Sequence, residues 1–275
     1  MYSYRKENYI MDYEIIRNDN DFHEWHSYAP IDSQYVKYSS SEPSIIAAGH
    51  KIEDVYYCFA NARASFMNAG LDNYGDICGD NDISKKYTKS HFLTVSLLEY
   101  AICLDISWQV IWAYTQPSSF EYLINQKYKE MEKECTSESV HTQLNCIISQ
   151  NGVGIVQAQK LKQILTDFEN DSCVKKLRSI YNGLKHQGTI HFQGLGEQLN
   201  SMMMSVENKT IPTLGRKSYT LEEIENLLFE YHFKFKEYFN SIIQEIMPPD
   251  YKDGKVSFVD YVNTILNMNS VLSDD

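Results

Sequence analysis

Apolar residues recur every three or four positions along most of this 275-residue chain, which is the spacing of one face of an α-helix. Gly70 follows the first long stretch and Pro117 follows the second, and both residue types end helices. Two capping boxes, Ser118 to Glu121 and Thr220 to Glu223, indicate where later helices begin. The predicted helices cover residues 44–68, 92–115, 118–134, 136–149, 154–168, 171–186, 220–246 and 255–268.

Three stretches lack this pattern. Residues 1–43 are polar, aromatic and acidic, and they predict an arm that packs on the body and contains short extended pieces. Residues 71–90 are rich in Gly, Asp and Asn and predict a solvated loop; calcium is disfavoured because the EF-hand order of acids is absent. Residues 188–219 predict a long excursion with a β-hairpin.

The fold class that follows is all-α. We expect an antiparallel helical bundle with an N-terminal arm, a long loop or small β-hairpin excursion, and added C-terminal helices. The arm takes residues 1–43, the bundle 44–192, and the excursion with the C-terminal helices 193–275, all packed as a single compact unit.

Composition narrows the function. A net charge of −12 argues against a wide nucleic-acid-binding surface, because neutralisation of phosphates dominates such affinity. Residues 160–191 nevertheless carry six Lys or Arg against three acids. The 21 tyrosines predict a half-buried aromatic shell rather than a base-stacking surface. A small basic site on an acidic body is therefore the form of nucleic-acid site that the composition permits.

Six widely spaced cysteines, with no C-x-x-C pair, predict free buried thiols in a reducing compartment. We expect no metal and no cofactor, although the spacing of His50, Cys58 and Cys78 leaves a zinc site open.

The stretch from Phe92 to Tyr114 is long enough to cross a bilayer, but it contains Glu99, Asp105 and Gln109. A buried central helix is therefore the preferred interpretation, with no membrane association. The N-terminus is polar and shows no signal peptide, so we expect a cytoplasmic protein.

The segment from Leu177 to Gly188 carries the most chemistry. Residues four apart advance only about 40° around a helix, so Arg178, Asn182 and His186 form one stripe with Lys185 beside it. Arg can hold a phosphate with two hydrogen bonds, and His titrates near neutral pH and can act as a general acid or base. These groups suit metal-independent RNA cleavage, in which the ribose 2′-hydroxyl is the nucleophile.

A structural interpretation explains the same residues. Lys185, His186 and Gly188 would place cations at the negative end of a helix and supply its terminal glycine. Asn182-Gly183 could also form a turn, which would break the stripe.

Polar residues on the central helix offer partners for these cations. Asp105 and Gln109 lie one turn apart in an apolar segment, with Glu99 further along. A buried carboxylate needs a partner, and Arg178 or Lys185 is the natural candidate. Such pairing would form either an active site or a structural ion pair.

Two segments resemble the HEPN superfamily (higher eukaryotes and prokaryotes nucleotide-binding domain). One is the central stretch from Cys103 to Trp112, and the other is the Tyr-Asn-Gly-Leu-Lys-His-Gln-Gly segment from Tyr181 to Gly188. The resemblance covers about residues 90–192, with the segment from 44 adding a helix, and it is closest to a prokaryotic branch.

Many HEPN proteins are metal-independent RNases of defence or toxin systems that act as dimers. The resemblance implies an RNA- or nucleotide-binding homodimer with His186 as acid or base, Asn182 as an orienting group, and Arg178 or Lys185 stabilising the phosphorane. Lys185 and Tyr181 would contact substrate, and a cognate antitoxin or other partner protein is implied.

The chain departs from the HEPN signature of an Arg, four to six residues, and a His. Seven residues separate Arg178 from His186. If Asn182 is the residue that follows the signature Arg, that Arg would stand at position 181, where this chain has Tyr181. HEPN proteins without the full signature serve as nucleotide-binding, scaffolding or partner-binding modules. A non-catalytic module of this kind is the second interpretation.

Overall fold

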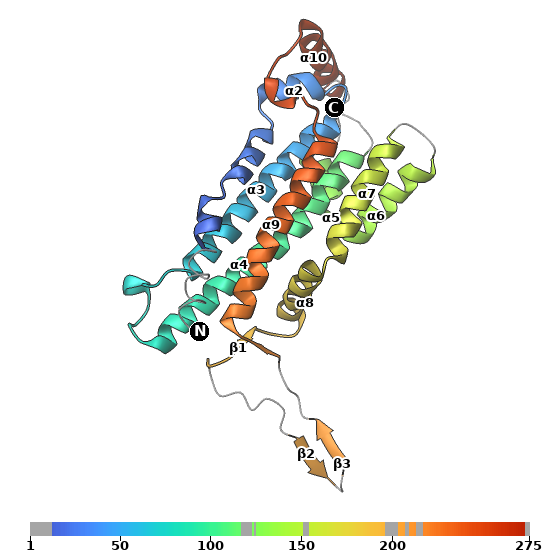
Figure 1. Ribbon diagram of the computed structural model, residues 1–275. Helices are drawn as coiled ribbons and strands as arrows, with labels where there is room; N and C mark the ends of the chain where they lie inside the picture. Colours follow the sequence, from blue (N-terminus) through green and yellow to red (C-terminus); the bar gives the residue numbers. More distant parts are fainter. Residues whose placement is uncertain are drawn as a thin grey trace. The chain divides into compact units, whose positions relative to one another are not determined.

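The computed structural model describes residues 13–116, 123, 125–150, 154–195, 203–206, 209–212 and 217–272. The protein is an all-α helical bundle, as the hydrophobic pattern predicts (Figure 1). The elements are η1 (Asp21–Tyr28), α2 (Asp32–Tyr38), α3 (Pro43–Ala69), η2 (Gly75–Ile77), α4 (Asp82–Thr115), α5 (Asn125–Lys133), α6 (Ser137–Ser149), α7 (Ile155–Asn170), α8 (Ser172–His186), β1 (His191–Phe192), β2 (Met203–Val206), β3 (Lys209–Pro212), β4 (Ser218–Tyr219), α9 (Leu221–Ile246), η4 (Tyr251–Asp253) and α10 (Phe258–Leu272).

The chain divides into two compact units assembled from alternating stretches. Unit 1 comprises the residues up to Asp19, Asn61–Ala101 and Ser172–Phe233; unit 2 comprises Asn20–Ala60, Ile102–Asp171 and Lys234–Asp275. Helices α3, α4 and α9 each contribute residues to both units. The predicted packing as a single body stays a prediction.

Unit 1 has an apolar core that includes a buried ionisable group. Leu97 and Tyr231 are fully buried. Glu225, also buried, accepts a hydrogen bond from the Tyr13 hydroxyl at 2.5 Å and pairs with Lys89 at 2.5 Å. Burial raises the pKa of the Glu225 carboxyl to about 9. A buried carboxyl is tolerated here because both neighbours satisfy it.

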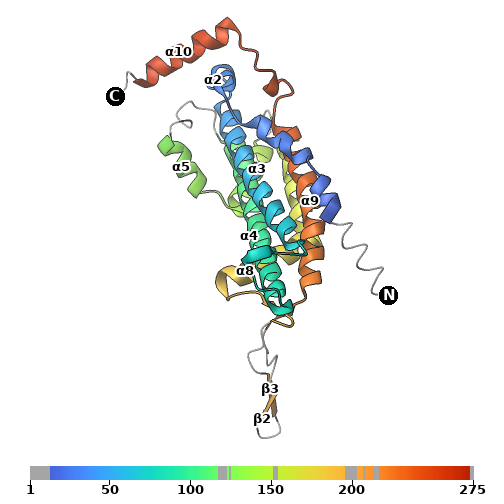
Figure 2. The same ribbon diagram turned by 90° about the vertical axis from the view of Figure 1, so that its left-hand side faces the viewer.

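Unit 2 is held by an aromatic cluster. The Trp25 ring lies 5.0 Å from that of Phe59 and 4.8 Å from that of Phe239, in edge-on contacts that favour aromatic pairs. The indole N–H of Trp25 donates to Asn240 at 2.7 Å, so its one polar group is satisfied. Within this unit α10 packs on α2, where the Thr264 hydroxyl donates to the Val36 carbonyl at 2.9 Å (Figure 2).

The N-terminal arm needs a correction. In its described part, residues 13–43, helices occur at 13–18, in η1 and in α2, and there is no strand. The predicted extended pieces are therefore wrong for these residues. Phe22 and Trp25, three positions apart, are both buried, which is the spacing of one helical face.

The loop predicted for residues 71–90 is also partly wrong, because α4 begins at Asp82. The Asn81 side chain accepts a hydrogen bond from the Ser84 amide at 2.9 Å and caps this end. Ile83 and Tyr87 are 69% and 68% exposed. Since these first turns bury no apolar face, hydrophobic periodicity gives no signal for them.

The excursion contains the predicted hairpin. β2 and β3 pair antiparallel, with Met203 opposite Pro212 and Val206 opposite Lys209. The predicted capping box at Ser118 lies outside the described residues. Among the described helices, α4 is the one long and apolar enough to cross a membrane, and 56% of its most apolar window is buried within the protein. This burial is compatible with the buried central helix expected from the sequence.

Candidate functional site

Helix α8 carries the predicted motif in unit 1. Its buried residues are Cys173, Val174, Leu177 and Ile180, spaced so that one face packs inward, and its exposed residues are all polar. The helix continues through Asn182-Gly183 without a break, which rules out the turn considered from sequence. Gly188, with a φ of 134°, donates its N–H to the Gly183 carbonyl at 3.2 Å and closes the end. The predicted glycine termination is confirmed.

The stripe itself is solvent-accessible. Asn182, Lys185 and His186 are exposed, while Arg178 and Tyr181 are half-buried. The Arg178 guanidinium lies 5.3 Å from the centre of the Tyr181 ring, and the Lys185 ammonium lies 6.0 Å from it. Tyr181 therefore holds two cations beside it, through contacts that favour a charged group over an aromatic face.

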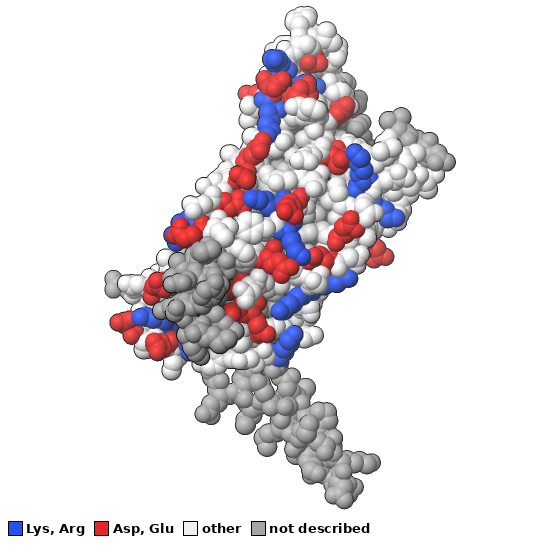
Figure 3. Space-filling model, viewed as in Figure 1, with Lys and Arg blue, Asp and Glu red and all other residues white. Residues whose placement is uncertain are grey.

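The electrostatics of α8 differ from those of the chain. The helix has Lys175, Lys176, Arg178 and Lys185 and not one Asp or Glu, in a protein with a net charge of −12. On the face shown in Figure 3, Lys and Arg side chains lie among Asp and Glu. The visible surface therefore has the mixed character that disfavours a broad nucleic-acid interface, and a local basic site is the alternative.

A pocket of about 450 Å³ lies along the neighbouring face of α8. Its lining is Ser179, Ile180, Gly183, Leu184, Gln187, Gly188, Thr189, Ile190, His191, Lys217 and Tyr219. His186, Asn182 and Arg178 do not line it. The stripe and the pocket are thus adjacent faces of one helix. An extended ligand could contact both faces, but the two sets of side chains do not converge on one point.

Strand pairing completes the pocket. β1 and β4 pair in parallel, with His191 opposite Ser218 and Phe192 opposite Tyr219. This pairing brings His191 and Lys217 to one wall, and the Lys217 ammonium lies 4.9 Å from the Tyr219 ring centre. Sequence analysis missed both residues, because a two-residue strand gives no periodic signal and its partner is far along the chain.

The three supporting residues predicted on the central helix are half-buried. Glu99 belongs to unit 1 with the motif, whereas Asp105 and Gln109 belong to unit 2. Pairing of Arg178 or Lys185 with these carboxylates stays a prediction.

A second group of polar residues in unit 1 resembles a catalytic triad but is closed to solvent. The His232 ring bonds the Tyr100 hydroxyl at 2.7 Å through one nitrogen and Asp19 at 3.1 Å through the other. The side chains of His232 and Asp19 are 0% and 6% exposed. No substrate reaches such a group, so it stabilises the core.

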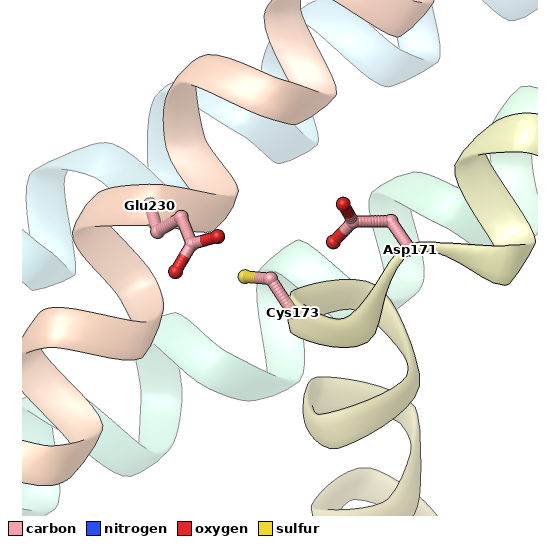
Figure 4. Close-up of side chains that lie close together, drawn as sticks. All are labelled: Asp171, Cys173 and Glu230. Atoms are coloured by element: carbon pink, nitrogen blue, oxygen red, sulfur yellow. The ribbon is translucent and has the colours of Figure 1, made fainter.

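Cys173 of α8 and Glu230 of α9 point towards one another (Figure 4). Their ligand atoms lie within 4.8 Å of each other, and the thiol donates to the Leu227 carbonyl at 3.6 Å. Asp171, the third side chain labelled in Figure 4, belongs to unit 2. The two possible ligands within unit 1 are fewer than the about four of a structural metal site. Cys58, Cys103 and Cys173 are buried, as predicted, whereas Cys78 and Cys135 are half-buried and Cys146 is exposed, so the predicted burial is wrong for these three.

No protein-family model matches the sequence, and comparisons with curated proteins and with solved structures find no match. The functional argument therefore rests on the residues of α8 and the pocket beside it.

Proposed function

We propose that this protein binds RNA or a nucleotide at α8. The observation that carries the proposal is the accessible stripe of Asn182, Lys185 and His186 on a helix that contains four cations and no acid. Phosphate would lie against the stripe, and the pocket with His191 and Lys217 would hold a base or sugar. The volume of this pocket is in the range of small-molecule sites.

The proposal extends to metal-independent cleavage of RNA, as the HEPN resemblance implies. In this reaction His186 transfers the proton, Asn182 orients the scissile group, and Arg178 or Lys185 stabilises the phosphorane. The protein would act as a cytoplasmic homodimer in which two stripes meet, with a role in a defence or toxin system and a cognate partner protein.

Purified protein should cut single-stranded RNA in EDTA, and His186→Ala should abolish the cutting. His91→Ala is the matched control, because His91 is an exposed histidine of unit 1 on a different helix. This control should keep wild-type activity. Equal activity in His186→Ala and wild type would exclude His186 as the catalytic residue and point to a contaminating nuclease.

A second candidate function is a non-catalytic module that binds a nucleotide or a partner protein. The observation that favours it is the position of Tyr181, whose ring engages both Arg178 and Lys185 where the HEPN signature would supply a free Arg. This module would bind labelled RNA in a fluorescence anisotropy assay without cutting it. Lys185→Ala would then weaken binding and reduce its salt dependence.

A further inference from the structure

A second pocket, of about 340 Å³, lies in unit 2 and is unrelated to α8. Its lining comes from three helices: α2 supplies Tyr35, α3 supplies Ala47, His50, Glu53 and Asp54, and α5 supplies Tyr128, with Leu123 at one side. Aromatic rings and carboxylates that line one concave site favour a positively charged ligand.

Three rings form the wall. The His50 ring lies 6.0 Å from that of Tyr35 and 6.5 Å from that of Tyr128, both edge-on. The Tyr35 hydroxyl and a His50 nitrogen are hydrogen-bonded at 2.7 Å, which fixes the imidazole. Burial lowers the pKa of His50, so the imidazole is neutral at pH 7 and adds no positive charge to the pocket.

The charges at the pocket are mainly negative. Asp54 and Glu132 share the ammonium of Lys51, at 2.9 Å from Asp54. Glu53 has no Lys or Arg within ion-pair distance among the described residues, and its ionisable neighbour is His26 at 3.8 Å. The carboxylates of Glu53, Asp54 and Glu132 and the ammonium of Lys51 sum to a net charge of −2. Because Asp54 and Glu132 contact Lys51, the Glu53 carboxylate is the one available to a ligand.

Lys51 shows what this environment stabilises. Its side chain is 8% exposed, and its ammonium lies 5.5 Å from the Tyr128 ring centre and beside two carboxylates. The protein thus already holds one ammonium group against the aromatic wall. An aromatic face and a carboxylate together are the usual means of recognising an organic cation.

We propose that this pocket binds a small organic cation through its ammonium group, with Glu53 as the counter-charge and the rings of Tyr35 and Tyr128 as the aromatic wall. The ligand class is a primary or quaternary alkylammonium compound small enough for a pocket of about 340 Å³. The site belongs to unit 2 and does not depend on the function proposed for α8.

Calorimetric titration of the full chain with n-butylammonium and with tetramethylammonium chloride tests this proposal, with n-butanol as the neutral probe and sodium chloride as the ionic-strength control. Both cations should bind in the millimolar range or tighter, and n-butanol should bind more weakly. Glu53→Gln should weaken cation binding about tenfold, since it removes the unneutralised charge.

Matched variants separate charge, ring and folding effects. Glu245→Gln removes a carboxylate of unit 2 that pairs instead with Lys160 and has a similar exposure, 26% against 29% for Glu53. It should bind as wild type. Tyr128→Phe keeps the ring and should retain affinity, whereas Tyr128→Leu should lose it several-fold.

Three results would overturn the proposal: no heat or saturation-transfer NMR signal with either cation, equal binding of n-butanol, or wild-type affinity in Glu53→Gln. Circular dichroism of each variant establishes that it is folded. If Tyr128→Leu is unfolded, Glu53→Gln and Tyr128→Phe still decide the outcome.

Discussion

His50 shows how the surroundings of one side chain set its charge. Burial lowers its pKa from the ordinary value of 6.5, against the opposing influence of Glu53 and Asp54, while Lys51 adds to the lowering. The unfolded chain therefore takes up this proton at higher pH than the folded protein does. The contribution of His50 to the free energy of unfolding is therefore fully present above pH 6.5, and it is lost as the pH falls through the folded-state pKa.

We accordingly expect the melting temperature of wild type to fall between pH 7 and pH 5, and to fall less steeply in His50→Gln. The control is His91→Gln, whose exposed side chain should leave the wild-type slope unchanged. NMR titration of the His50 ring protons should give a midpoint below 6.5. A midpoint above that value would contradict the burial argument.

At the same scale, the sequence located the exposed residues of the α8 stripe but not their neighbours. Residues four apart must share a helical face, so Arg178, Asn182 and His186 were predictable together. His191 and Lys217 were not, because a strand pairing between distant segments brings them to the pocket. The contact of Arg178 with Tyr181 is local and could have been predicted from their three-residue spacing.

Among the elements, α9 begins where the capping box from Thr220 to Glu223 predicts. The Thr220 hydroxyl accepts a hydrogen bond from the Glu223 amide at 3.0 Å, and the Glu223 carboxylate accepts one from the Thr220 amide at 2.8 Å. Both bonds satisfy N–H groups at the start of the helix, which have no carbonyl acceptor within the helix. The predicted capping box is therefore confirmed.

Thr220→Ala should therefore lower the free energy of unfolding by about 1 kcal/mol, measured by urea denaturation. Ser241→Ala, in the same helix, is the control: the Ser241 hydroxyl donates to the Glu237 carbonyl within the helix and caps no end. Its loss should be near zero, because alanine favours the helix. Equal losses in both variants would show that the cap contributes nothing specific.

Element prediction succeeded where an apolar face is buried and failed where it is not. The stretch of α4 from Phe92 onward was predictable because residues such as Leu97 and Leu104 are buried at regular spacing. Its first turns, held by the Asn81 cap with Ile83 and Tyr87 in solvent, were not. The arm failed for a related reason: its helices are too short to show a period clearly.

The whole molecule is defined by two units that share three helices. Trp25, Trp108 and Trp112, the three tryptophans of the chain, all belong to unit 2, so tryptophan fluorescence reports on that unit alone. Circular dichroism reports on both. Because α3, α4 and α9 continue from one unit into the other, we expect the two units to unfold together.

Leu97→Ala tests this coupling, since Leu97 is a fully buried residue of unit 1. The substitution should cost about 3 kcal/mol. It should lower the fluorescence-detected and dichroism-detected melting temperatures equally. An unchanged fluorescence transition beside an early dichroism transition would show that the units melt separately.

The alternation of the chain between the units has a consequence for ancestry. Neither unit is a contiguous stretch of sequence, and the crossings at 60–61, 101–102 and 233–234 fall inside helices. A single recombination event could not have joined them as ready-made modules, nor could one now exchange either for a foreign copy. Replacing a whole unit would therefore take several coordinated exchanges, with junctions that fall inside α3, α4 and α9.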